Sequence, residues 1–176
     1  MVKRRVPRVA SQVVLNHHQR FKGGGYPPRV DHVTGEHMEA ISGHRIPVFC
    51  RIAMVCDVYD AATCQRVYSN PKLPVQVLHE MRTVYRDFFD PAIARAFYEI
   101  IPPFLIGQVV KLSNGVEAVV VHFNPKWPVK TKVQGIRAPN GQRFSSPSLE
   151  ELDLAIYSEL EITDVDGVDV RPFRAS

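Results

Sequence analysis

Hydrophobic positions in the first hundred residues recur at helical intervals. Apolar side chains three or four residues apart predict helices over residues 6–18, 48–59, 77–85 and 91–101. Pro47 suits the first turn of the second helix, and Asp90-Pro91 is typical of an N-cap followed by a proline in the first turn of the last. The last helix is expected to end before Pro102-Pro103. Its expected buried stripe is Ile93, Phe97, Ile100 and Ile101.

The pattern changes after Pro103. Apolar runs over residues 109–112 and 116–123 flank Asn114-Gly115, which predicts a β-hairpin closed by a tight turn. Further turns are expected at Asn140-Gly141 and Asp166-Gly167, and short strands are predicted at 132–137, 159–162 and 168–171. The sequence therefore predicts a mainly α fold, a partial helical bundle followed by a small β-rich region.

We expect the helical domain to cover residues 1–103 and the β-rich extension residues 104–176. Two roles are open for the extension. It packs on the last helix and caps the bundle, which we favour, or it forms a small barrel that presents Phe123 and Trp127 to a partner.

Composition narrows the class of protein. The chain has 176 residues, 45% of them hydrophobic, which is enough for a packed core. No apolar run approaches the roughly 20 residues of a membrane span, and no apolar signal core follows the basic start. The three cysteines form no CxxC spacing, so we expect a reducing cytoplasm, with Cys56 and Cys64 packed as small hydrophobes.

The net charge of +4 does not by itself indicate a nucleic-acid partner. A basic cluster at the start could attract phosphates, but a solvated terminus is the favoured interpretation. We therefore expect neither DNA nor RNA as a partner. The cluster consists of Lys3, Arg4, Arg5 and Arg8.

Two groups of residues carry candidate chemistry. His17-His18 precede a glycine-rich turn, and Asp57 and Asp60 lie in a segment otherwise suited to a core helix. Their three-residue spacing places both aspartates on one helix face. A buried carboxylate needs a partner, because an unpaired charge in the interior is costly. A metal ion and an arginine both remain open as that partner.

Several motifs occur in a fixed order over residues 6–101. Residues 17–27 read HHQRFKGGGYP, residues 57–61 read DVYDA, and residues 89–91 read FDP. Ile46-Pro47, Arg51-Ile52, Arg66 and Tyr68 lie between or beside them. Together these motifs resemble the HD-GYP family, whose signature is His-His-Glu-x-x-Asp-Gly-x-Gly-Tyr-Pro, followed by an Arg-Pro-Tyr tract and a Phe-Asp-Pro.

The resemblance implies a helical, metal-dependent phosphodiesterase that hydrolyses cyclic di-GMP in bacterial signalling. In that family two or three iron or manganese ions activate a water molecule. Carried over to this chain, the metal ligands would be His17, His18 and Asp57, and Asp60 would orient them. Arg66 would contact a substrate phosphate. The loop Gly25-Tyr26-Pro27 would form a rim of the site and a possible docking surface for a diguanylate cyclase (GGDEF) domain or a response regulator.

The chain also departs from the family's pattern. The family's His-Asp dyad lies upstream of the His-His motif, but none of the sixteen residues before His17 is His, Asp or Glu. Gln19 replaces a Glu, and Lys22 replaces an Asp, which reverses a charge near the expected metals. We therefore expect an incomplete site that is weakly active or inactive in this chain. The alternatives are a non-catalytic partner- or nucleotide-binding module and a one-metal hydrolase of another phosphoester.

Overall fold

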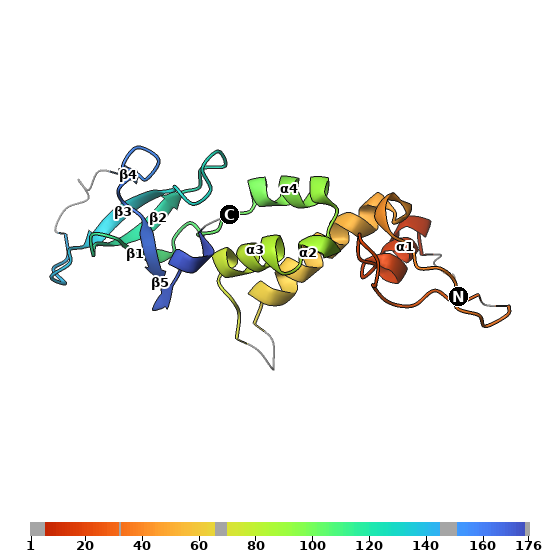
Figure 1. Ribbon diagram of the computed structural model, residues 1–176. Helices are drawn as coiled ribbons and strands as arrows, with labels where there is room; N and C mark the ends of the chain where they lie inside the picture. The colour runs from red at the N-terminus through yellow and green to blue at the C-terminus, as the bar shows by residue number, and fades with distance from the viewer. Residues whose placement is uncertain (1–5, 32, 66–69, 145–150, 175–176) are drawn as a thin grey trace, which may run out of the picture.

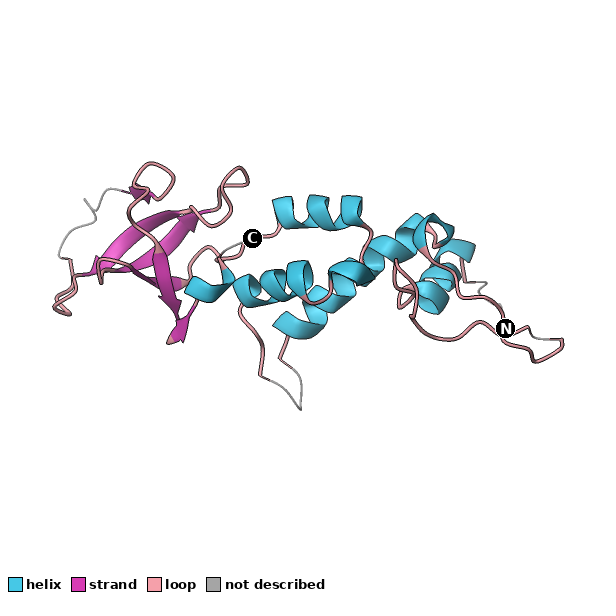
Figure 2. Cartoon of the chain, in the orientation of Figure 1, coloured by secondary structure: helices cyan, strands magenta, loops and turns pink. Residues whose placement is uncertain are grey.

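The structure is a computed structural model that describes residues 6–31, 33–65, 70–144 and 151–174. The molecule is elongated, with a β-sheet at one end, α2, α3 and α4 in the middle and α1 at the other end (Figures 1 and 2). The described helices are α1 (Arg8–Asn16), α2 (Val48–Thr63), α3 (Pro74–Thr83) and α4 (Pro91–Ile100), with short 3-10 turns η1 (Gly43–Arg45) and η2 (Arg86–Phe88). All four predicted helices are confirmed. None of these helices is long and apolar enough to cross a membrane.

Local sequence signals account for the helix starts. The Asp90 carboxylate accepts hydrogen bonds from the Ala92 and Ile93 amides, which confirms the predicted N-cap of α4. Pro47 occupies the N-cap position of α2 and not its first turn. The difference is one residue, within the usual uncertainty of helix boundaries.

The helical part has its own apolar core. Side chains of α2, α3 and α4 meet there, and α1 contributes no buried residue to it. The predicted stripe of α4 is only partly correct, since Phe97 is buried but Ile100 is 69% exposed. The buried members are Met54, Val55, Val77, Leu78, Met81, Phe89, Ala94 and Phe97.

The expected mainly α class is wrong, because the second half forms a full six-stranded antiparallel sheet and makes the fold mixed α and β. The strand order is β4-β3-β2-β1-β5-β6. The sheet has a buried cluster larger than that of the helices, which includes Leu112, Val120 and Val133. The strands are β1 (Val109–Leu112), β2 (Glu117–His122), β3 (Lys132–Arg137), β4 (Glu151–Asp153), β5 (Ile162–Val165) and β6 (Val168–Asp169).

Two tight turns join strands that are neighbours in the sheet. The Asn114-Gly115 hairpin is confirmed: Gly115 has a φ of 84° and its amide bonds the Leu112 carbonyl. Asp166 and Gly167 both have positive φ between β5 and β6, as a tight hairpin turn requires. The strand predicted at 159–162 begins three residues later, and β4 was not predicted.

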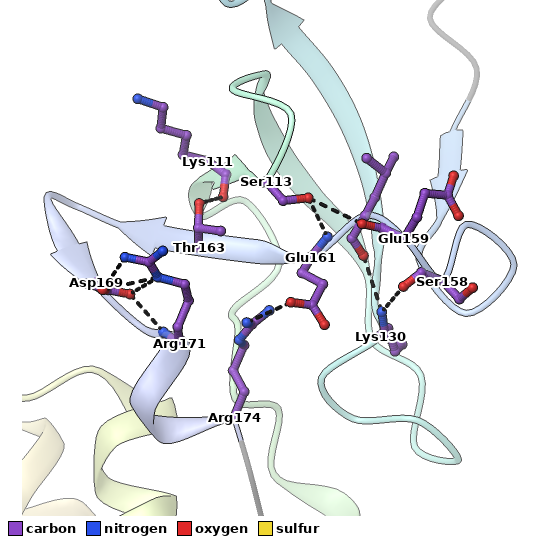
Figure 3. A network of polar contacts seen from close by, with 11 residues as sticks. Lys111, Ser113, Lys130, Ser158, Glu159, Glu161, Thr163, Asp169, Arg171 and Arg174 are labelled. Atoms are coloured by element: carbon purple, nitrogen blue, oxygen red, sulfur yellow. Dashed lines mark hydrogen bonds and ion pairs between the residues drawn. The ribbon is translucent and has the colours of Figure 1, made fainter.

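Polar contacts fasten the C-terminal segment to the sheet (Figure 3). Lys130 donates to the Ser158 and Leu160 carbonyls at 3.0 and 3.2 Å, and Arg174 pairs with Glu161 at 2.8 Å. The Lys130 contacts hold the segment that follows β4 against the loop before β3, and the Arg174 contact ties the last described residues to the same segment.

The β region packs on the bundle through α3. Val75 of α3 belongs to the sheet's buried cluster, and the Phe173 ring lies edge-on to His79 at 5.7 Å between centroids. Trp127 keeps 55% of its surface exposed. The limits 1–103 and 104–176 remain expectations for the two domains, because Val75 of the helical half is part of the sheet's core.

Candidate metal centre

His17 lies at the end of α1 in a defined orientation. It is the C-cap residue, and its amide bonds the Val13 carbonyl. Its ring Nδ1 lies 2.7 Å from the same carbonyl oxygen. Because a carbonyl only accepts, Nδ1 carries the proton in the neutral ring, and the lone pair of Nε2 is left free. Metal-binding histidines in proteins are commonly held in this way through their second nitrogen.

His18 is held by the glycine-rich loop that follows it. The Tyr26 ring stacks on the His18 ring, with centroids 4.3 Å apart and an interplanar angle of 24°, and the Tyr26 amide bonds the His18 carbonyl. The two histidine rings are 3.9 Å apart. The loop therefore folds back over the His-His pair and fixes the second ring.

Gly25 permits this close return of the loop. A Cβ at this position would overlap the His18 carbonyl oxygen and lie 2.6 Å from the Arg20 amide nitrogen. Gln19, only 3% exposed, donates from its side-chain amide to the Pro27 carbonyl at 2.7 Å. Gln19 thus ties both ends of the loop together, a role that the sequence alone did not indicate.

Asp57 approaches the histidines from α2. Cys50, seven residues earlier and on the same face, donates its thiol to the Gln12 carbonyl of α1 at 3.2 Å. This contact lies where α1 meets α2, and about two turns further along α2 the Asp57 Oδ2 lies 3.9 Å from His18 Nδ1. The expectation that Asp57 and Asp60 are buried is wrong: both are exposed, because α1 covers α2 only in part. The expectation that Cys56 and Cys64 pack as small hydrophobes is also wrong, because both are exposed; of the three cysteines only Cys50 is buried.

The three side chains form one cluster, which we call the triad. One potential ligand atom from each of His17, His18 and Asp57 lies within 4.8 Å of the others. Metal–ligand bonds of about 2.1 Å place two donors of one ion at most about 4.2 Å apart. The separation of 3.9 Å between His18 and Asp57 already meets this limit, and the outer limit of 4.8 Å for the whole cluster exceeds it by about 0.6 Å. None of the three residues is buried, so small side-chain movements can close that gap and the donor set fits a divalent ion. It is the only such cluster among the residues that the structure describes.

Other predicted site residues lie at different distances from the triad. Tyr26 contacts it directly, whereas the side chain of Pro27 lines a separate cavity. Asp60 lies one turn beyond Asp57, and its carboxylate accepts from the Cys64 thiol at 3.3 Å. Its orienting role stays a prediction. Arg66 and Tyr68 lie outside the described residues, as do Lys3, Arg4 and Arg5.

The charge reversal at Lys22 points away from the triad. Its ammonium pairs with Asp87 at 2.6 Å, and this contact is the main cause that lowers the pKa of Asp87. The pair lines a cleft of about 710 Å³ that contains no triad residue. A smaller cavity of about 320 Å³ is bordered by His18 and Asp57. We take the smaller cavity as the candidate substrate pocket, because it adjoins the cluster of ligand atoms and the larger cleft does not.

A buried ion pair connects the triad's helix to the rest of the bundle. Arg51 of α2 bonds Asp90, the N-cap of α4, and its Nε donates to the Ile46 carbonyl. The side chains of Arg51 and Asp90 are only 14% and 4% exposed. Burial alone would raise the pKa of Asp90, but Arg51 and the two amides at the helix start outweigh it and lower the pKa. This arginine–aspartate pair involves Asp90 and not Asp57.

Comparison with known proteins gives relatives of one kind. The chain is 30% identical over 118 residues to a cyclic di-GMP phosphodiesterase of Pseudomonas aeruginosa. The matched region covers 67% of this chain and 26% of that protein. It is 30% identical over 97 residues to a 3'3'-cGAMP-specific phosphodiesterase of Vibrio cholerae, over 55% of this chain and 16% of that protein. A cyclic di-GMP phosphodiesterase of Thermotoga maritima is 26% identical over 93 residues, 53% of this chain and 22% of its own length.

The chain is a partial match to the HD-GYP family. No protein-family model matches it. The chain spans about a quarter or less of the length of these three relatives. The HD-GYP resemblance of the motifs is thus confirmed, and ligation by individual residues stays a prediction.

Proposed function

We propose that this chain contributes part of the active site of a metal-dependent phosphodiesterase that acts on a guanine-containing cyclic dinucleotide. The convergence of His17, His18 and Asp57 on one point is the observation that carries the proposal. The relatives' names support the substrate class, since they act on cyclic di-GMP or 3'3'-cGAMP. Cyclic di-GMP is the substrate that we consider first.

The triad would bind the ion through two imidazole nitrogens and one carboxylate oxygen. This mixed donor set suits iron or manganese. A bound divalent ion would lower the pKa of a coordinated water and polarise a phosphoryl oxygen. The Val13 carbonyl would hold the proton on Nδ1 of His17, and Tyr26 would keep the His18 ring in place by stacking. The adjoining cavity would hold the nucleotide beside the ion.

Three protein donors supply one ion, whereas the family's site holds two or three. We therefore expect the isolated chain to bind about one metal equivalent and to hydrolyse cyclic di-GMP slowly or not at all. The same count of donors favours the second candidate, a module that binds nucleotide without hydrolysing it. A GGDEF domain or a response regulator as partner stays a prediction, for which the half-exposed Tyr26 loop is the candidate surface.

Metal analysis of the purified chain, followed by a hydrolysis assay with cyclic di-GMP, tests the proposal. We expect about one equivalent of iron or manganese, lost in the variants His17→Ala, His18→Ala and Asp57→Asn. His122→Ala is the matched control, because this exposed histidine lies on β2 in the sheet. Well under one equivalent in the unmodified chain, or unchanged binding in all three variants, would refute ligation. Rapid metal-dependent turnover would refute the expected weak activity.

A further inference from the structure

The cavity beside the triad contains an ion pair that the proposed mechanism does not use. Lys72 Nζ lies 2.6 and 2.8 Å from the two carboxylate oxygens of Glu80, and both residues line the cavity with His18 and Asp57. Glu80 keeps 28% of its side chain exposed and Lys72 keeps 49%. Exposed pairs of this kind contribute only about 0–1 kcal/mol to stability, so the pair remains available for recognition.

A backbone hydrogen bond anchors Lys72 to the helix that carries Asp57. The Lys72 amide bonds the Ala62 carbonyl of α2, five residues after Asp57. At about 1.5 Å per residue, the anchor of Lys72 lies about 7.5 Å from Asp57 along the helix axis. His18, Asp57, Lys72 and Glu80 all line one cavity. A nucleotide in that cavity with its phosphate at the triad would therefore lie beside the ion pair.

The walls of the cavity suit a flat, partly apolar ring. The Arg20 guanidinium lies 3.8 Å from the centroid of the Phe88 ring, and both residues line the cavity with Tyr85. Nucleic-acid bases in proteins commonly stack on aromatic rings and on arginine planes. Met54, only 6% exposed, and the fully buried Met81 border the cavity from the apolar core.

The ion pair matches one base better than the others. Guanine presents an acceptor, O6, beside two parallel donors, N1–H and N2–H. A carboxylate accepts two parallel donors, and an ammonium donates to an oxygen. Adenine offers a nitrogen acceptor at N1 where guanine has a donor, so it would leave a carboxylate oxygen without a partner.

We propose that this cavity is a guanine-binding subsite, in which Glu80 accepts from N1–H and N2–H and Lys72 donates to O6. The inference rests on the proposed function, because it assigns the base of the nucleotide whose phosphate would meet the triad. It adds a source of base specificity that involves no metal ligand.

Metal-free titration of the full chain with GMP and with AMP, followed by two-dimensional NMR, tests the subsite. We expect GMP to bind at least about tenfold more tightly than AMP, with shifts at the amides of Lys72, Glu80 and Tyr85. Glu80→Gln should remove this preference, because an amide offers one acceptor and one donor. Glu117→Gln on β2 should keep it, since Glu117 pairs with Arg137 at 3.2 Å outside the cavity.

A second variant tests the subsite independently, in case Glu80→Gln does not fold. Lys72→Met keeps the carboxylate and should weaken GMP binding severalfold while leaving AMP binding unchanged. Equal affinity for the two nucleotides, no detectable GMP binding at millimolar concentration, or a preference that survives Glu80→Gln would overturn the subsite. Because no metal is present, these results are independent of the metal and hydrolysis assays. Loss of metal binding with a retained GMP preference would refute the proposed function alone.

Discussion

The buried pair of Arg51 and Asp90 gives a quantitative test of how the triad's helix is held. We consider Asp90→Asn, because asparagine is as good an N-cap as aspartate and the start of α4 keeps its hydrogen bonds. The substitution therefore keeps the N-cap, but it removes the charge and replaces the oxygen that accepts from Arg51 with an NH2 donor, so the arginine loses its partner. Breaking a buried pair by neutralising one partner costs about 3–5 kcal/mol. We expect about 3 kcal/mol at pH 7, since Arg51 keeps a little solvent contact and its bond to the Ile46 carbonyl.

The pH dependence gives the prediction a sign. The pKa of Asp90 is lowered in the folded chain, because Arg51 and the amides outweigh the effect of burial. A carboxyl group with a lowered folded pKa contributes stability that is fully present above its unfolded pKa of about 3.9. That contribution is lost as the pH falls through the folded value. The difference in unfolding free energy between the two proteins should therefore be largest at pH 7 and shrink below about pH 4.

Urea denaturation followed by circular dichroism measures this difference. With an m value of about 2 kcal/mol/M, a loss of about 3 kcal/mol moves the midpoint by about 1.5 M. Glu117→Gln, which breaks an exposed pair on the sheet, should cost only about 0–1 kcal/mol. A cost of less than about 1 kcal/mol for Asp90→Asn at pH 7, or a difference that persists undiminished at pH 3, would contradict the reasoning.

Three further substitutions test the site and the sheet. Gly25→Ala should lower the metal affinity of the chain at least about tenfold, because the new methyl group displaces the loop from His18. Competition with a chelator measures this affinity. An unchanged affinity would show that the close approach of the loop does not affect metal binding. Tyr26→Leu should lower that affinity about fivefold in the same assay by removing a stacking contact worth about 1 kcal/mol, and an effect as large as that of Gly25→Ala would contradict this limited role. Leu112→Ala should reduce the unfolding free energy by about 3 kcal/mol in urea, whereas the exposed Val109→Ala should cost under about 0.5 kcal/mol; similar costs for both would mean that the sheet's core is misplaced.

Periodic and turn signals predicted the elements well, because they depend on neighbours along the chain. The helical spacing around Phe97, the cap at Asp90 and the hairpin at Asn114-Gly115 are local features, and the structure contains all three. The three residues of β4 carry no alternating pattern, so their pairing with β3 depends on a partner strand that periodicity cannot identify.

Exposure and long-range contacts were harder to predict. Asp57 and Ile100 lie in segments whose helical spacing predicts burial, but both are exposed. Burial depends on which other element covers a helix face, and the spacing of apolar residues does not identify that element. The grouping of His17, His18 and Asp57 came from the order of family motifs and not from periodicity. The Lys72–Glu80 pair gave no sequence signal, since a loop and a helix bring it together.

The loose attachment of α1 has a consequence for how tightly an ion is held. His17 and His18 follow a helix with no buried residue, whose Val14 and Leu15 are 71% and 54% exposed, so α1 lies against α2 with few apolar contacts. If only a fraction of molecules has α1 docked, the apparent dissociation constant for the ion is the intrinsic one divided by that fraction. Coupling between two equilibria is reciprocal. Ion binding would therefore stabilise the docked position of α1 on α2 by the same factor by which docking of α1 strengthens ion binding.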